Sequence, residues 1–189
     1  MHPQPYCEAL AEFIGESKNV VIRTDRLVAE LGYRPRSKGS AIVNFNRQHA
    51  AYLALGLVAD GPKTRLKVSM DKAIASEIIY GPDVEAFCDE VMDGALSAHI
   101  LKTFSLPGVL LLVLNALANN KLTPGVHVIF ENEGDKIWRF TWDKGFSAPK
   151  SMSFLCDPAS FLEGGKYYHT HTLSHKALEW MAENAVEVE

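Results

Sequence analysis

Apolar residues recur at steps of three and four along the first third of the chain, which is the spacing of amphipathic helices. Over residues 8–16 four apolar positions face three glutamates, and this predicts a first helix. Thr24 or Asp25 can cap a second helix that Gly32 ends, with the run Val20-Val21-Ile22 as a short link before it. The first 32 residues therefore predict two short helices.

A third helix is expected to begin near Ser40, and its two sides differ sharply. One side is apolar and includes His49, which we interpret as a core histidine. The other side is polar but carries one charge only: Ser40, Asn44, Arg47, Gln48 and Ala51. Asn and Gln can pair with adenine and Arg with guanine, so this side has the chemistry for contacts to DNA base edges.

The segment after the third helix has the pattern of a β-ribbon. Leu55–Val58 ends the helix and begins an extended strand, Asp60-Gly61-Pro62 is a turn signal, and residues 65–68 alternate polar with apolar. The segments RLVAELGY, SAIVNFNRQHAAYLALGLV and LVADGPKTRLKV together resemble the winged helix-turn-helix superfamily, over residues 5–70. That resemblance implies a third helix in the major groove and a wing against the DNA backbone or the minor groove.

Residues 71–189 predict helices and a β-hairpin. Helical patterns cover 70–79, 84–99, 108–118 and 172–185, and strands are expected at 126–130, 136–142 and 151–155. The fold class is therefore α+β: an N-terminal winged helix-turn-helix (1–70) and a C-terminal helical domain with a β-hairpin (71–189). A second, acidic winged helix that serves dimerisation is an alternative for this part. The apolar run 106–118 is too short to span a membrane.

Charge separates the same two parts. Residues 1–70 hold ten Lys/Arg and six Asp/Glu, a net charge of +4, whereas residues 71–189 have a net charge of −8. A basic module beside an acidic one is typical of a protein that binds a polyanion with one part. We therefore expect double-stranded DNA as the partner, contacted by Arg34, Arg36, Lys38, Ser40, Asn44, Arg47, Gln48, Lys63, Arg65 and Lys67.

One cluster of histidines has the residue types of a metal site. His169 and His171 point the same way on a strand, and His175 follows on the next turn, so the three could bind zinc. Otherwise we expect no cofactor. The three isolated cysteines and the lack of a secretion signal at the start of the chain predict a cytoplasmic protein with reduced thiols.

The sequence thus predicts a sequence-specific DNA-binding protein that regulates transcription as a homodimer, with the helix at 108–118 as a candidate dimer interface. Two alternatives stay open. The first is a metal-dependent enzyme that uses His169, His171 and His175, although we do not expect catalysis. The second is an adaptor whose winged helix binds protein.

Overall fold

A β-hairpin lies at the centre of a five-stranded antiparallel sheet. In the computed structural model, which describes residues 2–36, 44–59, 63–79, 82–134, 137–145, 147–155 and 170–187, β2 (Val126–Glu133) pairs with β3 (Ile137–Lys144) along its whole length. β4 (Lys150–Leu155) and β1 (Glu77–Ile78) extend the sheet beyond β3, and β5 (Thr170–Leu173) pairs with β2. The strand order is β1-β4-β3-β2-β5. The predicted hairpin and the strand near 151–155 are confirmed.

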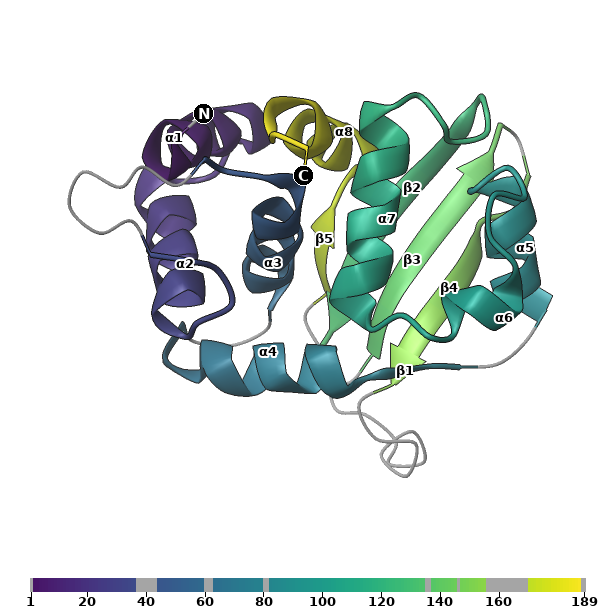
Figure 1. Ribbon diagram of the computed structural model, residues 1–189, viewed down its shortest axis with the longest axis horizontal. Coiled ribbons are helices and arrows are strands. Elements are labelled where there is room, and N and C mark those ends of the chain that lie inside the picture. Colours follow the sequence, from purple (N-terminus) through teal and green to yellow (C-terminus); the bar gives the residue numbers. More distant parts are fainter. Residues whose placement is uncertain are drawn as a thin grey trace.

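Alternation along the strands gives the sheet one buried face. Phe130, Phe140 and Met152 are neighbours in register and are almost completely buried, whereas Glu131, Arg139 and Ser153, one residue further along, are half-exposed. The apolar helix α7 (Leu106–Ala118) lies over the buried face (Figure 1). This helix confirms the prediction for 108–118.

Helices make up the rest of the described chain. The N-terminal part contains α1 (Pro3–Ile14), α2 (Lys18–Glu30), α3 (Arg47–Val58), the 3₁₀ turn η1 (Lys63–Arg65) and α4 (Leu66–Ala75). α5 (Pro82–Glu90) and α6 (Ala98–Leu101) lie beside the β1–β4 end of the sheet, and α8 (His175–Asn184) lies between α1 and α7 (Figure 1). The mixed helix and sheet content confirms the α+β class.

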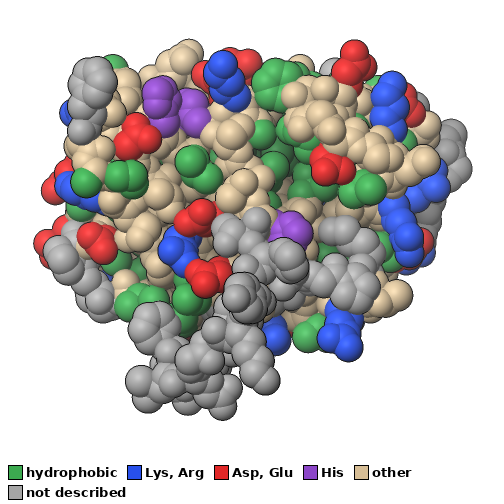
Figure 2. Space-filling model, turned by 180° about the vertical axis from the view of Figure 1, so that it is seen from behind, with side chains coloured by type: hydrophobic (Ala, Val, Ile, Leu, Met, Phe, Trp, Pro, Cys, Tyr) green, Lys and Arg blue, Asp and Glu red, His purple; other side chains and the backbone are tan. Residues whose placement is uncertain are grey.

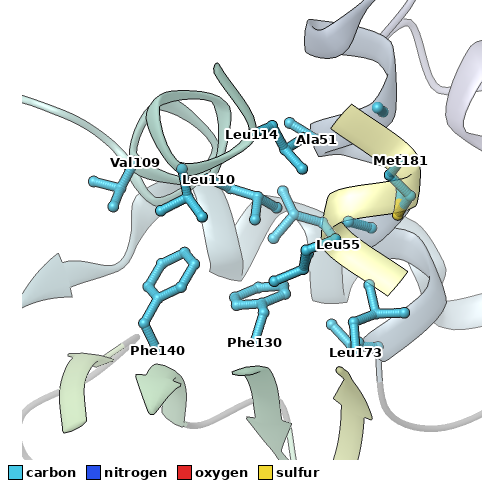
Figure 3. Packing of buried hydrophobic residues seen from close by; sticks show 14 of the residues in the cluster. Ala51, Leu55, Val109, Leu110, Leu114, Phe130, Phe140, Leu173 and Met181 are labelled. Atoms are coloured by element: carbon cyan, nitrogen blue, oxygen red, sulfur yellow. The ribbon is translucent and has the colours of Figure 1, made fainter. Parts of the chain in front are cut away.

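The buried residues form one hydrophobic cluster that includes both sides of the expected boundary at residue 70. Figure 3 shows Ala51 of α3 beside Leu114 of α7, and Leu55 of α3 next to Phe130 of the sheet. Met181 of α8 belongs to the same cluster. The N-terminal helices and the sheet therefore share a core.

α8 and the residues after it also hold the N-terminal helices by hydrogen bonds. The Tyr6 hydroxyl donates to the Met181 carbonyl at 3.0 Å. The Arg47 amide donates to the Val186 carbonyl, and the Val186 amide donates to the Phe45 carbonyl, both at 3.0 Å. These bonds join segments more than 130 residues apart in the sequence.

The start of the second helix was predicted too late. α2 begins at Lys18, so Val20-Val21-Ile22 is helical and not a link. Thr24 and Asp25 do not cap; both are buried within the helix. The Thr24 hydroxyl donates to the Val20 carbonyl at 2.9 Å, and Asp25 pairs with Arg34. These partners allow two residues that favour helix ends to lie in a helix interior.

The third helix begins later than expected, at Arg47. Asn46 caps it: the Asn46 Oδ1 accepts from the His49 amide at 2.9 Å, and the His49 Nδ1 accepts from the Asn46 amide at 3.3 Å. His49 is buried, as predicted for a core histidine. The expected start at Ser40 lies outside the described residues.

The prediction that residues 65–68 form the returning strand of a wing is wrong. Arg65 ends η1, and residues 66–75 form α4, with Leu66, Met70 and Ala73 buried at helical spacing. Alternation of polar and apolar residues over only four positions also fits the start of a helix, so the pattern at 65–68 did not distinguish a strand from α4. The turn at 60–62 lies outside the described residues, and the winged helix is not confirmed.

Two further helices differ from the prediction in their ends. The helix expected over 70–79 ends at Ala75, and Glu77–Ile78 pairs with β4. The helix expected over 84–99 stops at Glu90, where Asp93 (φ 51°) and Gly94 (φ 68°) take the left-handed conformation. Within the described ranges, no helix has the length and apolar character needed to cross a membrane.

Candidate nucleic-acid interface

The polar side expected on the third helix is not one continuous exposed surface. Asn44 and Gln48 are exposed, but Arg47 is buried, with only 8% of its surface exposed. The Arg47 Nε donates to the Ala182 carbonyl at 3.2 Å, and its Nη1 donates to the Asn115 Oδ1 at 3.3 Å. The Arg47 guanidinium therefore connects α3 to α8 and α7 instead of facing solvent.

The two arginines described in the turn before α3 bind the protein itself. Arg34 is buried, donates through Nε to the Asp25 Oδ1 at 2.7 Å, and forms a second bond from Nη2 to Oδ2. Arg36 is exposed, and its guanidinium donates to the Ala29 and Glu30 carbonyls at 3.3 and 3.0 Å. It thus satisfies the C-terminal end of α2, where a cation is favourable. Lys38 and Ser40 lie outside the described residues.

The cations expected on the wing lie on η1 and α4. Lys63 begins η1, and Arg65 is exposed at its end. The Lys67 Nζ lies 2.6 Å from the Asp71 Oδ2 on the surface of α4, and the Tyr33 hydroxyl also donates to Asp71. These two hydrogen bonds, from Lys67 first and then Tyr33, lower the pKa of Asp71. Lys67 is therefore already paired with a carboxylate.

The structure describes two of the three histidines of the expected cluster. His171 lies on β5 opposite Asn132, and His175 begins α8, where its Nδ1 accepts from the Val128 amide at 3.2 Å. The His175 ring lies 5.3 Å from that of His127, a neighbour outside the expected trio, and burial lowers its pKa. His169 lies outside the described residues. In the part of the chain that the structure describes, no group of three or more His, Cys, Asp or Glu side chains could hold a metal ion, so zinc stays a prediction.

Two helices joined by a short turn lie nearer the N-terminus than the expected recognition helix. α1 ends at Ile14, Gly15 adopts the left-handed conformation (φ 73°), and α2 begins at Lys18, after a turn of three residues. Leu10 of α1 and Val21 of α2 are both buried in the hydrophobic cluster. Short turns that contain glycine are typical of helix-turn-helix units, because glycine adopts a positive φ without a steric penalty.

The solvent side of α2 is polar and positively charged. Lys18, Asn19, Arg23 and Arg26 are all exposed, and the one acidic residue between them, Asp25, is buried against Arg34. Figure 2 shows several Lys and Arg side chains at the edge of the molecule that α1 and α2 form, on the right of this view. The α2 surface, defined here as Lys18, Asn19, Ile22, Arg23 and Arg26, thus presents three cations to solvent.

The α2 surface borders a hollow of about 590 Å³, whose opposite side is formed by Gln4 and Glu8 of α1. The Gln4 Nε2 donates to the Glu8 Oε1 at 2.9 Å. The first turns of α1 and α2 therefore face one shared, open depression, and Glu8 is the acidic residue in it.

The sequence contained a signal for this site that the predicted link at 20–22 obscured. Val21, Asp25 and Val28 are buried at steps of four and three, and with Lys18–Glu30 read as one helix, three cations fall on the other side. Comparisons with models of known protein families, with curated proteins and with solved structures gave no match.

Proposed function

We propose that the protein binds double-stranded DNA in a sequence-specific manner, with α2 as the helix that enters the major groove. The observation that carries this proposal is the α2 surface, an exposed cationic helix face that directly follows a three-residue, glycine-containing turn. The major groove of B-DNA, about 12 Å wide, admits an α-helix. In helix-turn-helix proteins the residues near the start of the second helix contact bases, while the first helix crosses the backbone.

The residues of α2 divide into two roles by position and chemistry. Asn19 and Arg23 lie on the first turns and have side chains that pair with adenine and guanine respectively. Lys18 at the start and Arg26 further along are placed to contact phosphates on either side. α3 is the weaker candidate, because Arg47, the one charged residue of its expected base-reading side, is held inside the protein. Roles as a regulator and as a homodimer remain part of the proposal.

The test is a comparison of a selected duplex with a random one. A binding site is first selected from a randomised duplex library with the full chain, and affinities are then measured by fluorescence anisotropy. Arg23→Ala is expected to cost about 1–3 kcal/mol on the selected duplex and much less on random DNA. Lys176→Ala, an exposed lysine on α8, is the matched control and should change neither affinity.

The salt dependence tests the phosphate contacts separately. If Lys18 and Arg26 each neutralise one phosphate, the double variant Lys18→Ala/Arg26→Ala should lower the affinity for the selected and the random duplex by the same factor. It should also flatten the log–log salt slope by about 1.8, at roughly 0.9 per phosphate. A folded chain that binds no duplex at any salt concentration would rule out this function and leave the adaptor as the leading alternative.

A further inference from the structure

A small apolar hollow opens beside α7, on a part of the molecule that the proposed DNA contacts do not use. Its walls are Met92, Ala95 and Leu96 on one side and Leu112 and Ala116 of α7 on the other, and its volume is about 210 Å³. The left-handed residues Asp93 and Gly94 turn the chain so that 92–96 faces α7. An apolar cavity of about 150 Å³ is large enough to bind benzene. This hollow therefore has room for one ring and a small polar group.

The polar groups of the hollow gather at the C-terminal end of α7. The carbonyls there are already bonded: the Asn115 carbonyl accepts from the Asn119 side chain at 2.8 Å, and the Ala116 carbonyl accepts from the Lys121 amide at 2.8 Å. The Asn115 Oδ1 is bonded to Arg47. These acceptors already have partners within the chain, so a cation is needed to offset the negative C-terminal end of α7 if an anion binds beside it.

Lys121 is the charged group at this end. It is exposed, and among the described residues no carboxylate forms an ion pair with it. We infer that the hollow is a binding site for a small carboxylate with a ring-sized apolar body. The body lies between Leu112 and Leu96, and the carboxylate accepts hydrogen bonds from the Lys121 ammonium. Pockets of this kind combine an apolar lining with a few polar groups that set orientation.

The test uses benzoate and its neutral analogue benzamide with the full chain. Titrations followed by ¹H–¹⁵N NMR and by calorimetry are expected to show that benzoate binds at one site. The chemical-shift changes should be centred on the amides of residues 92–96 and 112–121. Benzamide should bind at least tenfold more weakly. Lys121→Met should remove that difference and leave the affinity for benzamide unchanged, whereas Lys176→Met should change nothing.

A second variant tests the apolar part of the site. Ala95 is exposed on the wall of the hollow, so Ala95→Leu adds volume there without burying a larger side chain in the core. This variant should lose binding of both compounds while its melting temperature stays within a few degrees. Absence of benzoate binding to the wild-type chain would overturn the inference, and so would equal affinity for benzoate and benzamide. Because the inference does not depend on DNA binding, either can fail alone.

Discussion

The guanidinium of Arg47 takes part in contacts between three helices, since it donates to the Ala182 carbonyl and the Asn115 side chain. Removing it takes the donor away from the carbonyl of buried Ala182 and from the half-buried Asn115 side chain, so Arg47→Ala is expected to lower the free energy of unfolding by about 1.5–3 kcal/mol. Urea denaturation measures this change. The neighbouring exposed residue provides the control: Gln48→Ala should stay within about 0.5 kcal/mol of wild type. Weaker DNA binding by Arg47→Ala at unchanged stability would instead assign this arginine to the interface.

His49 gives the fold a dependence on pH. Burial, followed by the charge of Arg34, lowers the pKa of His49, while Asp25 opposes the shift. The unfolded chain therefore binds a proton more readily than the folded one, and stability decreases as the pH falls below about 6.5. We expect the free energy of unfolding to drop between pH 7 and pH 5. In His49→Gln this dependence of stability on pH should be smaller, because the titrating imidazole is gone. The glutamine Oε1 can still accept a hydrogen bond from the Asn46 amide, so the helix cap is kept.

A denaturation series at several pH values checks this prediction. Part of the slope should persist in His49→Gln, since burial also lowers the pKa of His175 and acts in the same direction. An identical slope in wild type and variant would contradict the assignment to His49.

At the scale of elements, a glycine sets how closely α2 approaches α3. A Cβ added at Gly56 would lie 2.8 Å from the Thr24 Cγ2 and 3.2 Å from the Val28 Cγ2. Helix propensity alone favours Gly56→Ala by about 1 kcal/mol, but overpacking typically costs about 1–3 kcal/mol. We expect a net loss of stability, because the clashing atoms belong to short side chains within a packed helix pair.

A double-mutant cycle separates these two effects. Thr24→Ser removes the Cγ2 but keeps the hydroxyl that bonds to Val20. Gly56→Ala should therefore cost less in the Thr24→Ser background than in wild type. Equal costs in both backgrounds would show that contact with Thr24 is not the cause.

The elements that were predictable are those whose signals are local. The hairpin of β2 and β3 and the helix α7 depend on alternation, a glycine turn and a continuous apolar run within a few residues. The start of α2 was not predictable, since Asp25 within it is stabilised by Arg34, nine residues away. The burial of Arg47 was not predictable either, since its guanidinium bonds to Ala182, 135 residues away. Such partners become visible only in the folded chain. The α2 surface was missed because the prediction placed Asp25 at a helix cap, although the spacing of Val21, Asp25 and Val28 carries a local signal for one longer helix.

At the scale of the whole molecule, the charge difference between residues 1–70 and 71–189 does not correspond to two separate cores. Tyr6 of α1, Leu53 of α3 and Met181 of α8 belong to one buried cluster. A chain that ends after Leu173 lacks α8 and exposes the apolar side of α1. We expect it to lose cooperative unfolding and the dispersed NMR spectrum of the full chain. Glu183→Gln, a change at an exposed position on α8, is the control. A truncated chain with the wild-type urea midpoint would contradict this view of the core.

The contacts between α8 and α1 also determine when the N-terminal helices can reach their native packing during synthesis on the ribosome. Val58 ends α3 and His175 begins α8. At roughly 5–20 residues per second, the ribosome needs about 6–23 s to add the residues between them. Throughout that interval the nascent chain exposes the surface of α1 that α8 later covers. The N-terminal helices should therefore reach their native packing only after α8 has left the exit tunnel.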